Sequence, residues 1–270
     1  MKLYFQKLGQ GPALIILHGL YGSSDNWVTI ARKLSSHYTI YLVDLRNHGR
    51  SPHSSEHTFE GMAADVDELM TSENIEKAYI LGHSMGGKTA MLFAALHPDK
   101  LLSLIIVDIY PGGYAELLQH SPQVIAHLNI VTTMLSIDMN DFSKRADIET
   151  ELAKTIKDLS VRQFIMKNVH RNPDNTFSWK LNISVISKAL PLIMGPIPLN
   201  KILDSKTLTL FPVLFMKGEH SSYIGPNQIA EIKKYFPKAQ IQTIAGAGHW
   251  VHADNPDQFM LVLEEFLNNN

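Results

Sequence analysis

Ser84 lies at the centre of residues 82–86, which read Gly-His-Ser-Met-Gly and form a G-x-S-x-G pattern. An apolar run at 78–81 precedes the pattern and helix-forming residues at 88–92 follow it, so we predict a sharp turn from strand to helix. Such a turn strains the serine backbone and lifts the hydroxyl clear of the sheet. We interpret Ser84 as the nucleophile of an acyl-transfer reaction; the alternative is a glycine-rich packing turn.

A general base must accompany this serine, because its hydroxyl is a weak nucleophile at neutral pH. Among the 13 histidines, His249 is the best candidate. It lies between the last predicted strand and the final helix, and the small residues at 245–248 leave its ring room to turn into a cleft. His252 is the alternative base.

The carboxylate that orients the base has two candidates. The loop after the strand at 212–216 contains no aspartate, and Glu219 is its only carboxylate. Asp108 ends the apolar strand at 101–107, at the kind of strand end where catalytic groups gather. A carboxylate there needs a partner, and an imidazole N–H is a suitable one. We favour Asp108 and keep Glu219 as the alternative.

Two backbone amides must stabilise the oxyanion of such a reaction. We expect one from Met85, which follows the nucleophile, and the other from the glycine-containing loop at 18–22. Leu20 is the favoured donor of that loop and Tyr21 the alternative. We expect His18 to brace the loop. Four neighbours of these groups are predicted to contact the substrate: His18, Tyr21, His83 and Trp250.

Strand and helix signals alternate along most of the chain. Predicted strands lie at 3–8, 13–17, 39–43, 78–81, 101–107, 212–216 and 240–244, and predicted helices at 26–34, 58–70, 84–96, 228–236 and 256–267. Near-continuous apolar strands of this kind suit a parallel sheet covered on both faces.

The alternation stops after Asp108 and resumes after residue 207. Between them the sequence shows helical segments and few strand signals. We predict an α/β fold with a mostly parallel central sheet flanked by helices. Residues 1–108 and 208–270 form its core domain, and residues 109–207 form an inserted helical lid.

Composition excludes several other classes of protein and of binding partner. With 24 basic and 26 acidic residues the net charge is −2, so no overall field attracts nucleic acid or an anionic membrane. The absence of cysteine excludes thiol catalysis and disulfides.

Residues 1–7 lack a signal-peptide core and no apolar run is long enough to insert stably in a membrane, so we expect a cytoplasmic protein. We expect no metal, since the histidines at 48, 53 and 57 lack paired carboxylates, and no cofactor. The oligomeric state is not predicted.

These motifs together resemble the α/β-hydrolase superfamily. The matching stretches are residues 18–19, 44–51, 82–86 and 248–249. Within the superfamily the chain is similar to the bacterial YbfF-type esterases, through residues 18–23 with 26–27, 82–88 and 245–253. The resemblance implies the α/β-hydrolase fold and a triad of Ser84, Asp108 and His249. The missing aspartate after residue 218 departs from the superfamily but not from this subfamily.

We therefore expect a serine hydrolase that cleaves small-molecule carboxylic esters with short to medium acyl chains, and acyl thioesters as a further option. Alternatives on the same fold are a thioesterase, perhydrolase, C–C hydrolase or lyase; a non-catalytic binding protein is the alternative outside enzymes. Four basic residues could assist an anionic substrate such as an acyl-CoA or brace loops and surfaces: Arg46, Arg50, Lys88 and Lys217.

Overall fold

A seven-stranded sheet forms the centre of the computed structural model, which describes residues 1–114, 121–203 and 208–270. The strand order is β1-β3-β2-β4-β5-β8-β9. β1 runs antiparallel to β3, and the other neighbours are parallel. The strands are β1 (Phe5–Leu8), β2 (Ala13–Leu17), β3 (Thr39–Val43), β4 (Ala78–His83), β5 (Leu101–Val107), β8 (Val213–Gly218) and β9 (Gln240–Ile244).

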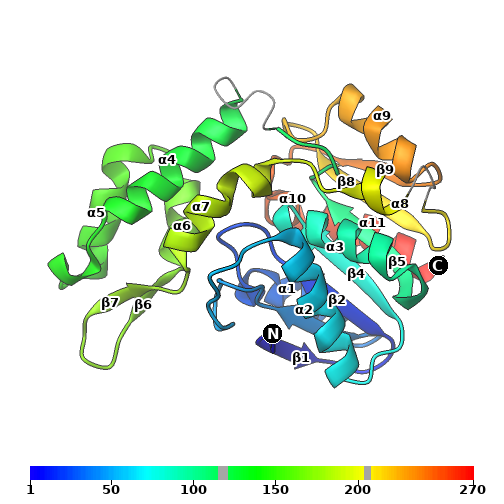
Figure 1. Ribbon diagram of the computed structural model, residues 1–270, viewed down its shortest axis with the longest axis horizontal. Coiled ribbons are helices and arrows are strands. Elements are labelled where there is room, and N and C mark those ends of the chain that lie inside the picture. The colour runs from blue at the N-terminus through cyan, green and yellow to red at the C-terminus, as the bar shows by residue number, and fades with distance from the viewer. Residues whose placement is uncertain (115–120, 204–207) are drawn as a thin grey trace.

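Both faces of the sheet are covered by helices (Figure 1). The alternation along β2 shows the two faces: Ile15 and Leu17 belong to one apolar cluster, and Leu14 and Ile16 to the other. α2 (Phe59–Ser72), α3 (Met85–Leu96) and α9 (Pro226–Tyr235) pack on the first face. α1 (Val28–Leu34), α10 (Val251–Asp254) and α11 (Pro256–Asn268) pack on the second. The predicted α/β architecture with a mostly parallel sheet is confirmed.

Between β5 and β8 the chain leaves the sheet (Figure 1). The described residues of this insertion form α4 (Pro122–Ser136), α5 (Arg145–Thr155), α6 (Leu159–Met166), α7 (Ile183–Met194) and α8 (Leu199–Leu203). A short hairpin of β6 (Val169–Arg171) and β7 (Phe177–Trp179) lies between α6 and α7. α4 to α7 stand beside the sheet, whereas α8 contacts α3. The predicted boundary at residue 207 lies outside the described residues.

The sequence located the core elements to within a few residues, and most differences have local causes. The predicted helix at 26–34 begins as a 3-10 turn, Ser24–Trp27, capped by Ser23 and Asn26. The hairpin of β6 and β7 was not predicted, because three-residue strands are too short for a periodic pattern. No helix in the described ranges is long and apolar enough to cross a membrane.

Parallel pairing places the ends of β2, β4, β5 and β8 at one edge of the sheet. His18 follows β2, Ser84 follows β4 and Asp108 follows β5, so residues far apart in the sequence meet at this edge.

Candidate active site

The turn between β4 and α3 has the geometry of a nucleophile elbow. Ser84 has φ 53° and ψ −119°, a left-handed conformation that is costly for a residue with a β-carbon. The glycines around it allow close backbone packing. A Cβ at Gly82 would lie 2.3 Å from the carbonyl oxygen of Gly86, and a Cβ at Gly86 would lie 2.4 Å from that of Leu17. The motif therefore needs glycine at both positions.

His249 lies between Ser84 and Asp108. Its Nε2 is 3.0 Å from Ser84 Oγ, and its Nδ1 is 2.8 Å from Asp108 Oδ2. Because an ionised carboxylate only accepts hydrogen bonds, Asp108 selects the tautomer with the proton on Nδ1. Nε2 then carries a lone pair directed at the serine hydroxyl. This arrangement can take a proton from Ser84.

Asp108 is fully buried and held by three donors. Its carboxylate accepts hydrogen bonds from the Gly218 amide at 3.1 Å, from the Ser221 hydroxyl and from His249. Its φ of 51° is a second left-handed conformation at the site. Glu219, by contrast, is 52% exposed and accepts a hydrogen bond from the Gly246 amide. The geometry favours Asp108 over Glu219 as the acid.

Two aromatic side chains fix the ring and backbone of His249. The phenol ring of Tyr223 stacks on its imidazole, with centroids 3.9 Å apart and planes 17° apart. His83 Nε2–H donates to the His249 carbonyl at 2.9 Å. Burial lowers the pKa of His83 well below its usual value, which keeps this ring neutral beside His249. The alternative base, His252, stacks on Trp27 instead.

The backbone amides of the loop after β2 differ in their hydrogen bonding. Tyr21 has φ 62°, and its N–H donates to His48 Nε2 at 3.3 Å, so this amide is already engaged. Within the described residues, the N–H groups of Leu20 and Met85 have no hydrogen-bond partner in the structure. This difference is compatible with the predicted choice of Leu20 over Tyr21 beside Met85.

His18 lies behind this loop and not on the cavity. Its Nδ1–H donates to the Gly19 carbonyl at 2.8 Å, and its Nε2 accepts from the Leu45 amide at 3.0 Å. Both ring nitrogens are used and the residue is buried. The predicted bracing role fits this geometry, whereas the predicted contact with substrate does not, because no face of the ring reaches the cavity.

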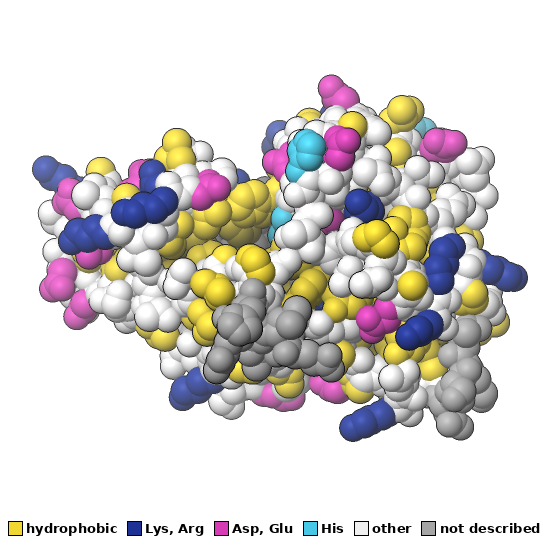
Figure 2. All heavy atoms as spheres, turned by 90° about the horizontal axis from the view of Figure 1, so that it is seen from above, with side chains coloured by type: hydrophobic (Ala, Val, Ile, Leu, Met, Phe, Trp, Pro, Cys, Tyr) yellow, Lys and Arg dark blue, Asp and Glu magenta, His cyan; other side chains and the backbone are white. Residues whose placement is uncertain are grey.

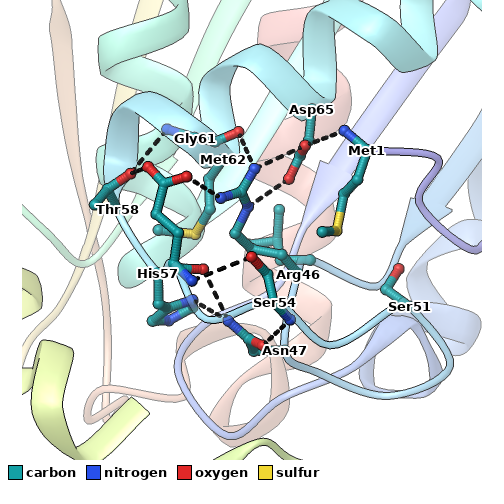
Figure 3. Close-up of polar contacts among 12 residues, drawn as sticks. Met1, Arg46, Asn47, Ser51, Ser54, His57, Thr58, Gly61, Met62 and Asp65 are labelled. Carbon is teal, nitrogen blue, oxygen red and sulfur yellow. Dashed lines mark hydrogen bonds and ion pairs between the residues drawn. The ribbon is translucent and has the colours of Figure 1, made fainter. Parts of the chain in front are cut away.

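The segment after β3 is braced by Arg46 and Asn47 (Figure 3). The guanidinium of Arg46 bonds both carboxylate oxygens of Asp65 on α2, at 2.7 and 3.0 Å. The side-chain Nδ2 of Asn47 donates to the Glu56 carbonyl, and its Oδ1 accepts a hydrogen bond from the Ser54 backbone amide. Arg46 is thus a structural cation here rather than a group facing a substrate. Arg50 likewise pairs with Asp25 at the surface.

An apolar cavity of about 180 Å³ opens over Ser84 and His249. Three of the predicted substrate residues, Tyr21, His83 and Trp250, line it together with Leu20. Figure 2 shows apolar side chains gathered in the hollow between the insertion and the body of the molecule. The insertion and the 217–223 loop add residues that local motifs did not indicate: Ala126, His127, Ile130, Val161, Phe164, Ile165 and Tyr223.

Lys88 is buried one turn along α3 from Ser84. Its Nζ donates to the Gly195 carbonyl at 2.5 Å and lies over the rings of Phe59 and Tyr114. Burial lowers the pKa of Lys88 to about 7, and the charge of Glu231 opposes that shift. The ammonium ties α3 to the insertion and also lines a small cavity beside Ser84.

The depressed pKa of Lys88 predicts a stability that rises with pH. Above about pH 7 the folded protein has lost a proton that the unfolded chain keeps until about pH 10.5. Relative to a Lys88→Met variant, the wild type should gain at most about 1.4 kcal/mol per pH unit between pH 7.5 and 9. Urea unfolding of both proteins measures this difference. Lys238→Met, on the surface, is the control and should show a constant difference; parallel curves for Lys88→Met would contradict the prediction.

The fold and the elbow define a class of protein, and comparison with known proteins agrees with it. The model of the alpha/beta hydrolase fold family matches residues 12–256. The chain belongs to this family.

Similar proteins carry esterase and lipase names. The chain is 37% identical over 258 residues to the sn-1-specific diacylglycerol lipase ABHD11 of Mus musculus, covering 95% of this chain and 81% of that protein. It is 31% identical to the esterase YbfF of Escherichia coli, over 95% of this chain and 93% of YbfF. A solved structure of a marine microorganism esterase superposes with a TM-score of 0.92 at 45% identity, covering 98% of this chain and 99% of that one.

Proposed function

We propose that this protein is a carboxylic ester hydrolase that works through an acyl-enzyme on Ser84. The observation that carries the proposal is the position of His249, which is hydrogen bonded to Ser84 on one side and to the buried Asp108 on the other. Esterase and lipase relatives over nearly the whole chain support the same class.

In the acylation half-reaction, His249 Nε2 takes the hydroxyl proton while Ser84 Oγ forms a bond to the acyl carbon. The carbonyl π electrons move to oxygen, and the Leu20 and Met85 amides stabilise that oxyanion. The carbonyl re-forms, the bond to the alkoxy oxygen breaks, and the proton on Nε2 passes to the departing alcohol. Asp108 stabilises the transient imidazolium.

Deacylation repeats these steps with water. His249 Nε2 removes a proton from water as its oxygen attacks the acyl carbon, and the oxyanion forms between the same two amides. When it collapses, the bond to Ser84 Oγ breaks and the proton returns to that oxygen. The acid leaves, and the enzyme regains its starting state.

The apolar cavity supports acyl chains of short to medium length. Aliphatic and aromatic side chains of the insertion line it beside Ser84, which gives the acyl chain an apolar environment. We assign residues 109–207 the role of a lid that shapes this cavity. A neutral ester fits the site better than an anionic substrate, because Arg46 and Arg50 pair with aspartates and the Nζ of Lys88 bonds the Gly195 carbonyl.

A panel of p-nitrophenyl esters and acyl thioesters tests the proposal. We expect turnover to be highest for short to medium acyl chains and to decline with long ones, because the cavity is small. A fluorophosphonate should label Ser84 stoichiometrically, as mass spectrometry of the digest can establish. Absence of both turnover and labelling would remove the proposed function.

A further inference from the structure

The turn that carries the Leu20 amide is held in a strained conformation. The Gly22 amide bonds the Gly19 carbonyl at 2.9 Å, so residues 19–22 form a β-turn with Leu20 and Tyr21 at its central positions. Tyr21 has φ 62°, where a residue with a β-carbon is disfavoured by about tenfold. The surrounding structure must therefore hold Tyr21, and with it the direction of the Leu20 amide.

Tyr21 is bonded at both peptide groups and at its side chain. Its N–H donates to His48 Nε2 at 3.3 Å. Its carbonyl accepts from Asn168 Nδ2 at 2.8 Å, and its hydroxyl lies 3.3 Å from His127 Nδ1. Asn168 and His127 both belong to the insertion, at the end of α6 and on α4. Two of the three restraints on Tyr21 thus come from the insertion.

Asn168 is buried, and hydrogen bonds fix its backbone on both sides. The residue is 3% exposed. Its own amide bonds the Ile165 carbonyl at 2.9 Å, and its carbonyl accepts from the Lys180 amide at 2.8 Å. These bonds fix Asn168 between α6 and the hairpin. Its carboxamide is aimed across the boundary at a single backbone carbonyl of the core.

The third restraint on Tyr21, its bond to His48, is connected to the insertion through Asn47. His48 adjoins Asn47, whose carbonyl and side-chain oxygen accept hydrogen bonds from Asn182 of the insertion, at 3.0 and 3.1 Å. Asn47 itself is held by the residues around Ser54 and His57 (Figure 3). The segment that carries His48 is therefore held between residues 54–57 and the insertion.

We propose that Asn168 is a positioning residue for the oxyanion hole: its amide holds Tyr21 in the left-handed conformation that directs the Leu20 N–H at the reacting carbonyl. The insertion then supplies part of the catalytic geometry in addition to covering the acyl cavity. This inference rests on the proposed function, since the oxyanion is that of the proposed ester hydrolysis.

Two substitutions at Asn168 test the inference. Asn168→Leu keeps most of the side-chain volume and Asn168→Ala does not, but both remove the donor to Tyr21. We expect each to lower kcat for a p-nitrophenyl ester by about 10- to 100-fold, because a misdirected oxyanion donor loses most of its effect. KM should change less than about threefold, since the ground-state ester does not need the oxyanion hole. The Ki of an alkylboronic acid, which imitates the tetrahedral state, should rise with the loss in kcat.

Asn172 provides the matched control. It lies four residues further along, in the loop between β6 and β7, and among the described residues its side chain bonds Thr176 and Ser178. Asn172→Leu and Asn172→Ala should leave kcat, KM and the boronate Ki unchanged. A similar loss of kcat in these variants would overturn the inference, and so would a rise in KM with kcat intact at Asn168.

Hydrogen exchange separates this inference from the proposed function. Peptides covering residues 18–24 should exchange faster in both Asn168 variants than in the wild type or the Asn172 variants, because the turn has lost a restraint. Unchanged exchange overturns the positioning role even if the enzyme is active. If the wild type lacks esterase activity, the proposed function fails, and faster exchange still supports Asn168 as the restraint on Tyr21.

Discussion

Ser84→Ala should reduce kcat for a p-nitrophenyl ester by about 10⁵- to 10⁶-fold, while the protein folds as before. Only the hydroxyl is removed, and it is the atom that would form the acyl-enzyme. The alanine keeps the β-carbon, so the strain at φ 53° does not change. Steady-state kinetics at high enzyme concentration measure the loss, and the fluorophosphonate adduct should disappear with it.

Ser103 offers a matched control for this prediction. It is a buried serine on β5 whose Oγ has no hydrogen-bond partner in the described structure. Ser103→Ala also removes one buried hydroxyl, but it should leave kcat within about twofold, because Ser103 lies near the start of β5, away from Asp108 at its end, and its hydroxyl holds no hydrogen bond among the described residues. Retained turnover in Ser84→Ala, with the same substrate preference, would mean that another group is the nucleophile.

The proposed catalytic machinery has a local sequence signature for each of its parts. The elbow needs glycines on both sides of Ser84, and the strand before it needs an apolar run. The positions of Asp108 and His249 follow from the rule that parallel strands end at one edge. These are short-range patterns, and the structure brings the three side chains within hydrogen-bonding distance.

The residues that support this machinery lack such signatures. Tyr223 stacks on His249, and Asn168 reaches Tyr21 from the insertion, but neither lies in a motif or in a periodic segment. Their roles depend on how the insertion docks on the core, which alternation of strands and helices does not specify. Local sequence also does not decide between Leu20 and Tyr21 as the oxyanion donor, because the Tyr21 amide is occupied by His48, which lies 27 positions away.

His18 shows how little a position in the sequence says about the direction of a side chain. Its place next to Gly19 suggested contact with the substrate, since neighbours of a catalytic loop often line the pocket. Both of its ring nitrogens bond backbone groups instead, one in the loop after β2 and one in the segment after β3. Burial lowers the pKa of His18 from its usual value, as expected for a neutral ring that holds two loops together. Proximity in sequence did not reveal which way the ring faces.

Asp108→Asn should lower kcat by about 10⁴-fold. The substituted amide can donate to His249 Nδ1, which would favour the tautomer with the proton on Nε2. That nitrogen could then no longer accept the proton of Ser84. The new NH₂ group would also meet the Gly218 amide or the Ser221 hydroxyl, both of which donate to the carboxylate. The comparison of kcat in wild type and variant, at constant pH, measures the effect.

Glu219→Gln is the matched control for Asp108→Asn. Glu219 is half exposed, and its bond to the Gly246 amide can be kept by the amide oxygen of glutamine. We therefore expect kcat within about threefold of wild type, because no proton in the reaction passes near this side chain. A severe loss in Glu219→Gln together with a mild one in Asp108→Asn would reassign the acid to the loop after β8. Because the two variants each replace one carboxylate by its amide, the contrast depends on position alone: a buried carboxylate that selects the tautomer of His249 against an exposed one that bonds a loop.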